Sequence, residues 1–134
     1  MDPQTSDQWM TVAEARLKEA RSIQEQMNAS VGPAYLSGYG VECALKAYAA
    51  GNGGKARGHD LVNLVRLAGL NLSHFKNDAW FLSDWAVDWR YLQRAEQLPH
   101  KPCECVKAAG NLHGYIAKQL MRKAKKRQRR SGQL

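Results

Sequence analysis

Arg94 and His100 are two side chains that can work together on a phosphodiester, and five residues separate them. A histidine can take the proton from a ribose 2′-hydroxyl that attacks the adjacent phosphate, a step that requires no metal. An arginine offers a planar fork that holds a phosphate and stabilises charge developing on its oxygens. An Arg and a His at this spacing also occur often by chance. In that case Arg94 caps the end of a helix, where cations are favourable, and His100 is an exposed loop residue.

The surroundings of His100 bear on its protonation. Pro99 precedes it and constrains its backbone, and a helix is expected to begin at about Cys103. A histidine just before a helix N-terminus feels the positive end of the helix dipole, which favours the neutral imidazole that a general base requires. The sequence therefore places His100 where it can act as a base.

Arg90 is a second candidate for binding phosphate, and Glu42 is its expected partner. Glu42 lies within a largely apolar segment, and charges in such positions are normally paired. Either Glu42 orients Arg90 toward a ligand, or Arg90 forms a buried ion pair with Glu42 or Asp88 that ties helices together. Lys46 lies one helical turn after Glu42 and is a further partner for it. The sequence leaves these alternatives open.

The side chains closest to a metal-binding pattern are those of His100, Cys103, Cys105 and His113. A single residue separates the two cysteines, whereas structural zinc sites place two to four residues within a cysteine pair. His113 lies two turns beyond Cys105, roughly 12 Å along a helix, which is too far for one ion. We therefore expect no metal site and no cofactor. Three cysteines without framework-like spacing favour a reduced cytoplasmic location.

The element that organises these candidates is the segment from residue 34 to residue 50. It follows Pro33, ends at Gly51, and is apolar on two faces. A helix that is apolar almost all the way round is buried at the centre of a domain. Gly38 and Gly40 weaken this helix locally and suggest that a neighbouring backbone approaches closely there.

Four further helices are expected around the central one, and no segment has the pattern of a strand. The first has a clear amphipathic stripe and a cap from Thr5 or Ser6. The expected ranges are about 7–27 for the first helix, 60–69 for a short third helix, 73 or 77 to about 94 for an aromatic-rich fourth helix, and about 103 onward for the last. The fold class is therefore all-α, an antiparallel helical bundle of about five helices. The 134-residue chain, with 44% apolar residues and four Trp, is large enough to form one core.

The net charge of +8 is concentrated at the C-terminal end. Removing the seven basic residues between positions 122 and 130 leaves 13 basic and 12 acidic residues, a net charge of +1. We therefore expect a domain over residues 1–121 and a basic, disordered tail over 122–134. Such a tail either binds nucleic acid, with Arg127, Arg129 and Arg130 contacting phosphates, or is simply solvated. No apolar run is long enough to span a membrane, and the polar, acidic N-terminal residues are unlike a secretory signal.

Three segments together resemble the HEPN domain family of small helical proteins. They are YLSGYGVECALKAY at residues 35–48, GHDLVNL at 58–64, and the Arg90–Tyr91 pair that precedes the last helix. The similarity covers roughly residues 9–121. It implies a HEPN-like helical bundle that forms a homodimer. It also places His59 and Tyr91 near the functional end of the bundle as supporting residues, although a cap or loop role for His59 is the simpler interpretation.

The resemblance also implies a function for the Arg94–His100 pair. Ribonuclease members of the family carry an Arg, four to six residues, and then a His, and here five residues intervene. Such members are toxin or defence endoribonucleases that act on RNA without metal, and those of this size are often paired with a minimal nucleotidyltransferase that neutralises them. Ala95 departs from the pattern, because these members often have a polar residue after the Arg. The alternative is a non-catalytic module that binds nucleotide, RNA or a partner protein.

Overall fold

The computed structural model describes residues 2–73 and 75–132. Within these ranges the regular secondary structure consists of helices only, and there is no strand. The five α-helices are α1 (Ser6–Gln26), α2 (Gly32–Gly51), α3 (Leu61–Ala68), α4 (Ala79–Asp84) and α5 (Pro102–Gly132), with 3-10 turns η1 (Val87–Tyr91) and η2 (Ala95–Gln97) between α4 and α5. The all-α prediction is confirmed. No described helix has both the length and the apolar character needed to cross a membrane.

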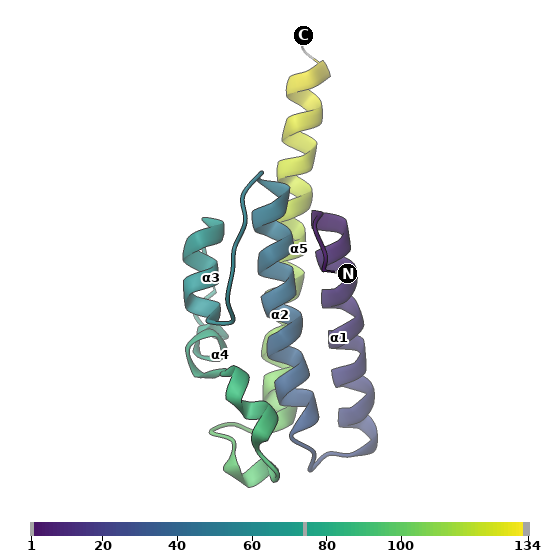
Figure 1. Cartoon of the computed structure of the whole chain (residues 1–134), viewed down its shortest axis with the longest axis vertical. Coiled ribbons are helices and arrows are strands. Elements are labelled where there is room, and N and C mark those ends of the chain that lie inside the picture. Colours follow the sequence, from purple (N-terminus) through teal and green to yellow (C-terminus); the bar gives the residue numbers. More distant parts are fainter. Residues whose placement is uncertain (1, 74, 133–134) are drawn as a thin grey trace.

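The central helix α2 packs against α1, α3 and α5, as the sequence predicts for a helix apolar on two faces (Figure 1). Thirteen of its 20 residues are buried, including the polar side chains of Ser37 and Glu42. Helix α1 runs antiparallel to α2, whereas α5 rises beside α2 in the same direction (Figure 1). The end of the bundle at which α2 and α5 begin is therefore opposite the end from which the last turns of α5 project (Figure 1).

Two glycines let neighbours approach α2. A Cβ on Gly40 would lie 2.7 Å from Leu17 Cγ of α1, so this glycine permits close helix packing. A Cβ on Gly38 would lie 2.0 Å from the ring of Trp85. The expectation of a close backbone neighbour is thus wrong at Gly38, where the neighbour is an indole ring that fills the space a side chain would take.

The expected helix ends are largely confirmed. Thr5 caps α1 by accepting a hydrogen bond from Gln8 N, and the Gln8 side chain accepts one from Thr5 N in return. Asp60 caps α3 by accepting from Asn63 N, and Gly69 ends α3 with a left-handed φ of +69°.

The fourth helix is the main error in the predicted elements. Instead of running to about residue 94, α4 ends at Asp84, and Trp85 and Ala86 are extended. Both Trp85 and Trp89 are buried, with 4% and 7% exposure. The chain leaves the helix so that each indole reaches the core, and this burial overrides the local helical pattern. The break also creates the irregular loop that carries residues 92–101.

The basic segment also differs from its prediction. Residues 122–132 continue α5 as helix, where charge composition suggested a disordered tail; residues 133 and 134 lie outside the described residues. Lys, Arg, Gln and Ala are good helix formers, and adding residues to an existing helix avoids the cost of nucleation. We call residues 122–132 the basic extension.

Candidate active site

His100 lies in the loop just before α5, and its imidazole is held by two residues of α4. His100 Nε2 is 2.6 Å from Asp84 Oδ2, and the Trp80 and His100 ring centroids are 3.9 Å apart. The histidine side chain is 29% exposed and the Asp84 side chain 40%. The imidazole is therefore fixed from two sides but still open to solvent.

The Asp84 contact determines which His100 nitrogen is available. An ionised carboxylate only accepts hydrogen bonds, so in the neutral ring Nε2 carries the hydrogen and Nδ1 carries the lone pair. Nδ1 makes no hydrogen bond to the described part of the chain. A carboxylate that fixes the tautomer of a histidine base and stabilises its protonated form is a recurring catalytic arrangement. The pair can accept a proton through Nδ1.

A groove of about 520 Å³ lies beside His100. The loop from Ala95 to Cys103 forms one wall, and Gln24 and Asn28, from the end of α1 and the turn after it, contribute to the other. Lys101 and Cys103 line the groove together with His100. An exposed lysine next to the histidine supplies positive charge where a phosphate would bind.

Arg94 is less closely associated with this groove than the sequence suggested. Its side chain is exposed, does not line the groove, and makes no hydrogen bond or ion pair with His100 among the described residues. Its backbone N donates to Gln97 Oε1 at 2.9 Å, so Arg94 begins the η2 turn and does not cap the end of a long helix. The structure therefore places the two motif residues on one loop without joining their side chains.

Arg90 and Tyr91 interact with each other at the surface of η1. Arg90 Nη2 donates to Tyr91 Oη at 2.8 Å, and the guanidinium lies 4.8 Å from the centre of the Tyr91 ring. This hydrogen bond raises the pKa of Arg90. Both residues are exposed, and neither lines the groove beside His100.

The expected pairing of Arg90 with Glu42 or Asp88 is wrong. Glu42, with 2% exposure, is bonded to Lys46 Nζ at 3.0 Å and to His59 Nδ1 at 2.9 Å. The pairing of Glu42 with Lys46 across one turn is confirmed. Glu42 and His59 thus belong to a cluster at the α2–α3 side of the bundle, and Arg90 is not part of it.

His100 lies just before the start of α5, whereas the basic extension is the last part of that helix and lies at the other end of the molecule (Figure 1). Lys123 Nζ is 4.7 Å from the centre of the Tyr48 ring, and Arg127 Nη2 donates to Asn52 Oδ1 at 3.1 Å. Arg129 and Arg130 are exposed in the last turn of α5. The three arginines expected to bind phosphate are therefore separated from the groove by the length of α2, ~30 Å at 1.5 Å per residue.

The cysteines divide into one exposed and two buried thiols. Burial raises the pKa of Cys43 to about 11 and that of Cys105 to about 12, whereas Cys103 is exposed. Within the described ranges, no three His, Cys, Asp or Glu side chains lie close enough together to hold a metal ion.

Sequence reasoning missed three residues of the candidate site, namely Trp80, Asp84 and Lys101. Asp84 lies sixteen residues before His100, so no short motif contains both. The signal for Lys101 was its position directly after His100. For Asp84 the available signal was an acidic residue within an aromatic segment. This signal indicates a site residue only when it is known that α4 ends at Asp84.

Comparison with known protein families matches residues 6–126 to the HEPN domain. The match covers most of the chain, and the protein belongs to the HEPN domain family. Neither the curated proteins nor the solved structures provide a match to this chain. HEPN domains are generally associated with ribonuclease or toxin-like roles or with nucleotide-related roles, and they often dimerise.

Proposed function

We propose that this HEPN protein is a metal-independent endoribonuclease of the toxin or defence type, with His100 as its general base. The supporting observation is the 2.6 Å contact between His100 Nε2 and Asp84 Oδ2 beside a groove. It leaves Nδ1 as the nitrogen that can take a proton. Family membership provides the association with RNA.

In the proposed reaction, His100 Nδ1 removes the proton from a ribose 2′-hydroxyl. The 2′-oxygen forms a bond to the adjacent phosphorus, and the bond from phosphorus to the 5′-oxygen of the next nucleotide breaks. The products are a 2′,3′-cyclic phosphate and a 5′-hydroxyl, which receives a proton from a general acid. Asp84 stabilises the imidazolium that forms.

Two cations are available for the phosphate in this proposal. Lys101 lines the groove, and Arg94 lies six residues before His100 on the same loop. Either can stabilise the negative charge that develops on the phosphate oxygens. Arg90 is a more distant contact for the RNA, since its guanidinium is exposed on the neighbouring η1 turn.

We further propose that the protein works as a cytoplasmic homodimer. In a two-fold dimer, His100 from the second subunit would act as the acid that protonates the leaving 5′-oxygen. A minimal nucleotidyltransferase is the proposed antitoxin partner, in keeping with the pairing described for similar family members.

The decisive test is cleavage of total RNA by the purified protein in excess chelator, with His100→Ala compared with the wild type. Cleavage that persists in chelator and is lost in His100→Ala supports the proposal. Intact RNA with both proteins, at concentrations where a dimer is confirmed, would instead support a non-catalytic module that binds nucleotide, RNA or a partner protein.

A further inference from the structure

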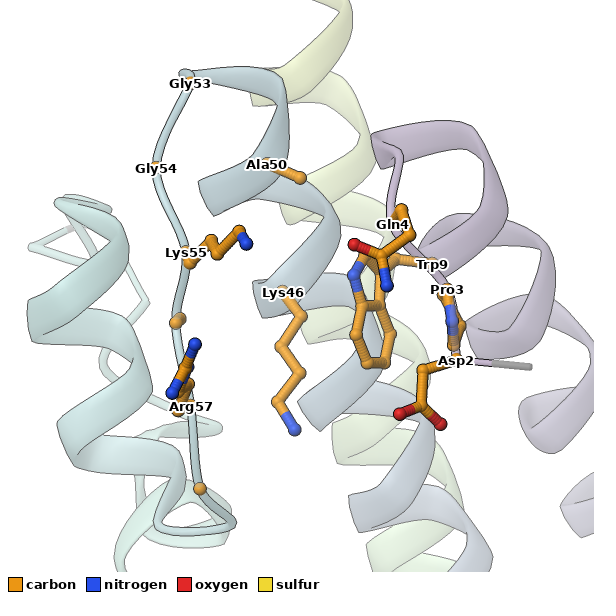
Figure 2. A pocket seen from close by; sticks show the side chains of 12 residues that line it. Asp2, Pro3, Gln4, Trp9, Lys46, Ala50, Gly53, Gly54, Lys55 and Arg57 are labelled. Atoms are coloured by element: carbon orange, nitrogen blue, oxygen red, sulfur yellow. The ribbon is translucent and has the colours of Figure 1, made fainter.

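A second cavity lies at the opposite end of the bundle from His100. It has a volume of about 560 Å³ and is formed by the N-terminal segment, the last turns of α2 and the loop that follows α2 (Figure 2). We call it the loop pocket. Trp9, Lys46, Lys55 and Arg57 are the side chains that carry the argument, and all four line it.

The loop pocket presents cations around an aromatic ring. Lys55 points from the loop toward α2, and Trp9 lies between α1 and α2 (Figure 2). Lys46 Nζ is 5.2 Å from the centre of the Trp9 ring. Aromatic rings with basic side chains close by are typical of surfaces that bind single-stranded nucleic acid, where bases stack and cations follow the phosphates.

The buried carboxylate of Glu42 fixes part of this arrangement. Its bond to Lys46 holds the lysine beside Trp9 and balances the charge of that lysine. Asp2 also lines the pocket and contributes a negative charge. The charge available to a ligand therefore comes from Lys55 and Arg57, which make no side-chain hydrogen bond or ion pair with the described part of the chain.

The basic extension adds positive charge beside the same loop. The hydrogen bond from Arg127 to Asn52 places this helix against the residues that follow α2. Seven basic residues lie between positions 122 and 130, and the rest of the chain has a net charge of +1. A polyanion is therefore attracted to this end of the molecule.

We propose that the loop pocket and the basic extension form a binding site for single-stranded RNA, separate from the groove beside His100. An unpaired base stacks on Trp9, Lys55 and Arg57 bind the flanking phosphates, and the strand continues along the basic extension. An acidic peptide would use the cations but would leave Trp9 without a flat partner. Base stacking requires an unpaired nucleotide, so the site favours single strands over duplexes.

The distance between the two ends gives a length requirement. Trp9 of the loop pocket and Gln24 of the groove both lie on α1, 15 residues apart, which is ~22 Å at 1.5 Å per residue. At about 3.4 Å per nucleotide of stacked strand, this corresponds to about seven nucleotides. An RNA that occupies both sites therefore needs at least about that length. This step depends on the proposed ribonuclease function, whereas the binding site itself does not.

The test measures binding of a fluorescent, single-stranded 2′-O-methyl RNA of about 12 nucleotides, which lacks the free 2′-hydroxyl needed for cleavage, to the full-length protein at several salt concentrations. The double variant Lys55→Gln with Arg57→Gln should bind about tenfold more weakly at low salt. Its slope of log affinity against log salt should flatten by about 1.4, because two phosphate contacts at about 0.7 each are lost. Lys18→Gln with Arg21→Gln is the matched control, since it removes the same charge from exposed positions on α1.

A second variant tests the stacking platform. Trp9→Phe keeps an aromatic ring against the core but offers a smaller stacking surface, so affinity should fall several-fold while the salt slope stays unchanged. A thermal melt checks that the variant is folded. An equal loss in the loop variant and the control, or unchanged affinity in the loop variant, would overturn the proposal. Binding of a mononucleotide as tight as that of the 12-nucleotide strand would overturn it as well.

The two proposals fail in different ways. If His100→Ala retains RNA binding and the wild type does not cleave, the ribonuclease proposal fails and the binding site stands. If cleavage depends on His100 while the loop variant binds and cleaves like the wild type, the binding site fails and the ribonuclease proposal stands.

Discussion

The described part of the chain contains two histidine–carboxylate pairs, and they differ in which partner is the more buried. At His100 the carboxylate of Asp84 is the more exposed partner, with side-chain exposures of 29% for the histidine and 40% for the aspartate. At His59 the histidine is 58% exposed and Glu42 only 2%. Glu42 is shared with Lys46, whereas Asp84 makes no other ion pair among the described residues.

This difference in the exposure of the two carboxylates favours different roles for the two pairs. A buried carboxylate shared by an ammonium and an imidazole holds two segments together. A solvent-accessible pair beside a groove can exchange protons with a ligand. The same two residue types therefore suit a structural role at one site and the proposed chemical role at the other.

The largest expected effect is a difference in RNA cleavage rate between variants of the two histidines. His100→Ala should lower RNA cleavage by about 10² to 10⁴-fold, the usual contribution of a general acid or base. His59→Ala should change the rate only a few-fold. Rates measured in chelator on the same RNA check this, and a larger loss for His59→Ala would reverse the assignment of the two pairs.

Variants of the two carboxylates should differ in their free energy of unfolding. Glu42→Leu leaves the Lys46 ammonium, with 11% side-chain exposure, buried without its partner, at a cost of about 3–5 kcal/mol. Asp84→Asn should cost less than about 1 kcal/mol, since its pair is partly exposed, yet it should reduce cleavage by disturbing the His100 tautomer. Urea unfolding gives the stabilities. Similar losses for both variants would contradict the comparison.

The two cations near the groove can be ranked by activity. Lys101→Ala should reduce cleavage by about tenfold or more, because Lys101 lines the groove with His100. Arg94→Ala should have a smaller effect, since its side chain does not line the groove. The opposite ranking in single-turnover rates would show that Arg94 moves into the groove when RNA binds.

The thiols provide a chemical probe of the His100 end. Only Cys103 should react with a maleimide in the native protein at neutral pH, because burial raises the pKa of Cys43 and Cys105 to about 11 and 12. Peptide mapping identifies the labelled residue. A bulky label on Cys103 should slow cleavage, since this residue lines the groove, and Cys103→Ser should abolish the effect of the reagent.

A smaller effect concerns His113, a third histidine, whose Nε2 is buried and has no hydrogen-bond partner in the described chain. Burial lowers the pKa of His113 below its usual 6.5. The unfolded chain then binds this proton more readily than the folded one, so the free energy of unfolding should fall as the pH drops from about 7 through the lowered pKa. His113→Leu should reduce this acid sensitivity in urea titrations.

Local sequence signals identified most of the fold. The apolar pattern of α2, the Thr5–Gln8 cap and the Asp60 and Gly69 boundaries all depend on residues within a few positions of each other, and each is confirmed. The error in α4 has a different origin. Its end depends on Trp85 packing on Gly38, a contact between residues 47 positions apart that no local pattern contains.

The residues of the candidate site also divide into those that local sequence signals indicate and those that depend on contacts between distant residues. His100 was identified from residue type and context, and its place between the fourth and last α-helices follows from the loop punctuation. Asp84 required the three-dimensional structure, because an extended Trp85 redirects the chain directly after it. Glu42 was correctly expected to be paired, but its partners were found only in part, since His59 reaches it from the following loop.

The Gly38–Trp85 contact makes the candidate site sensitive to a position in the core. Any side chain at position 38 would displace the indole, and Trp85 directly follows Asp84 in the chain. Overpacking of this kind usually costs about 1–3 kcal/mol, which a domain of this size can survive. Inherited changes at Gly38 would thus be tolerated by the fold but would disturb the segment that carries Asp84, so a residue without a side chain would limit how the proposed site can evolve.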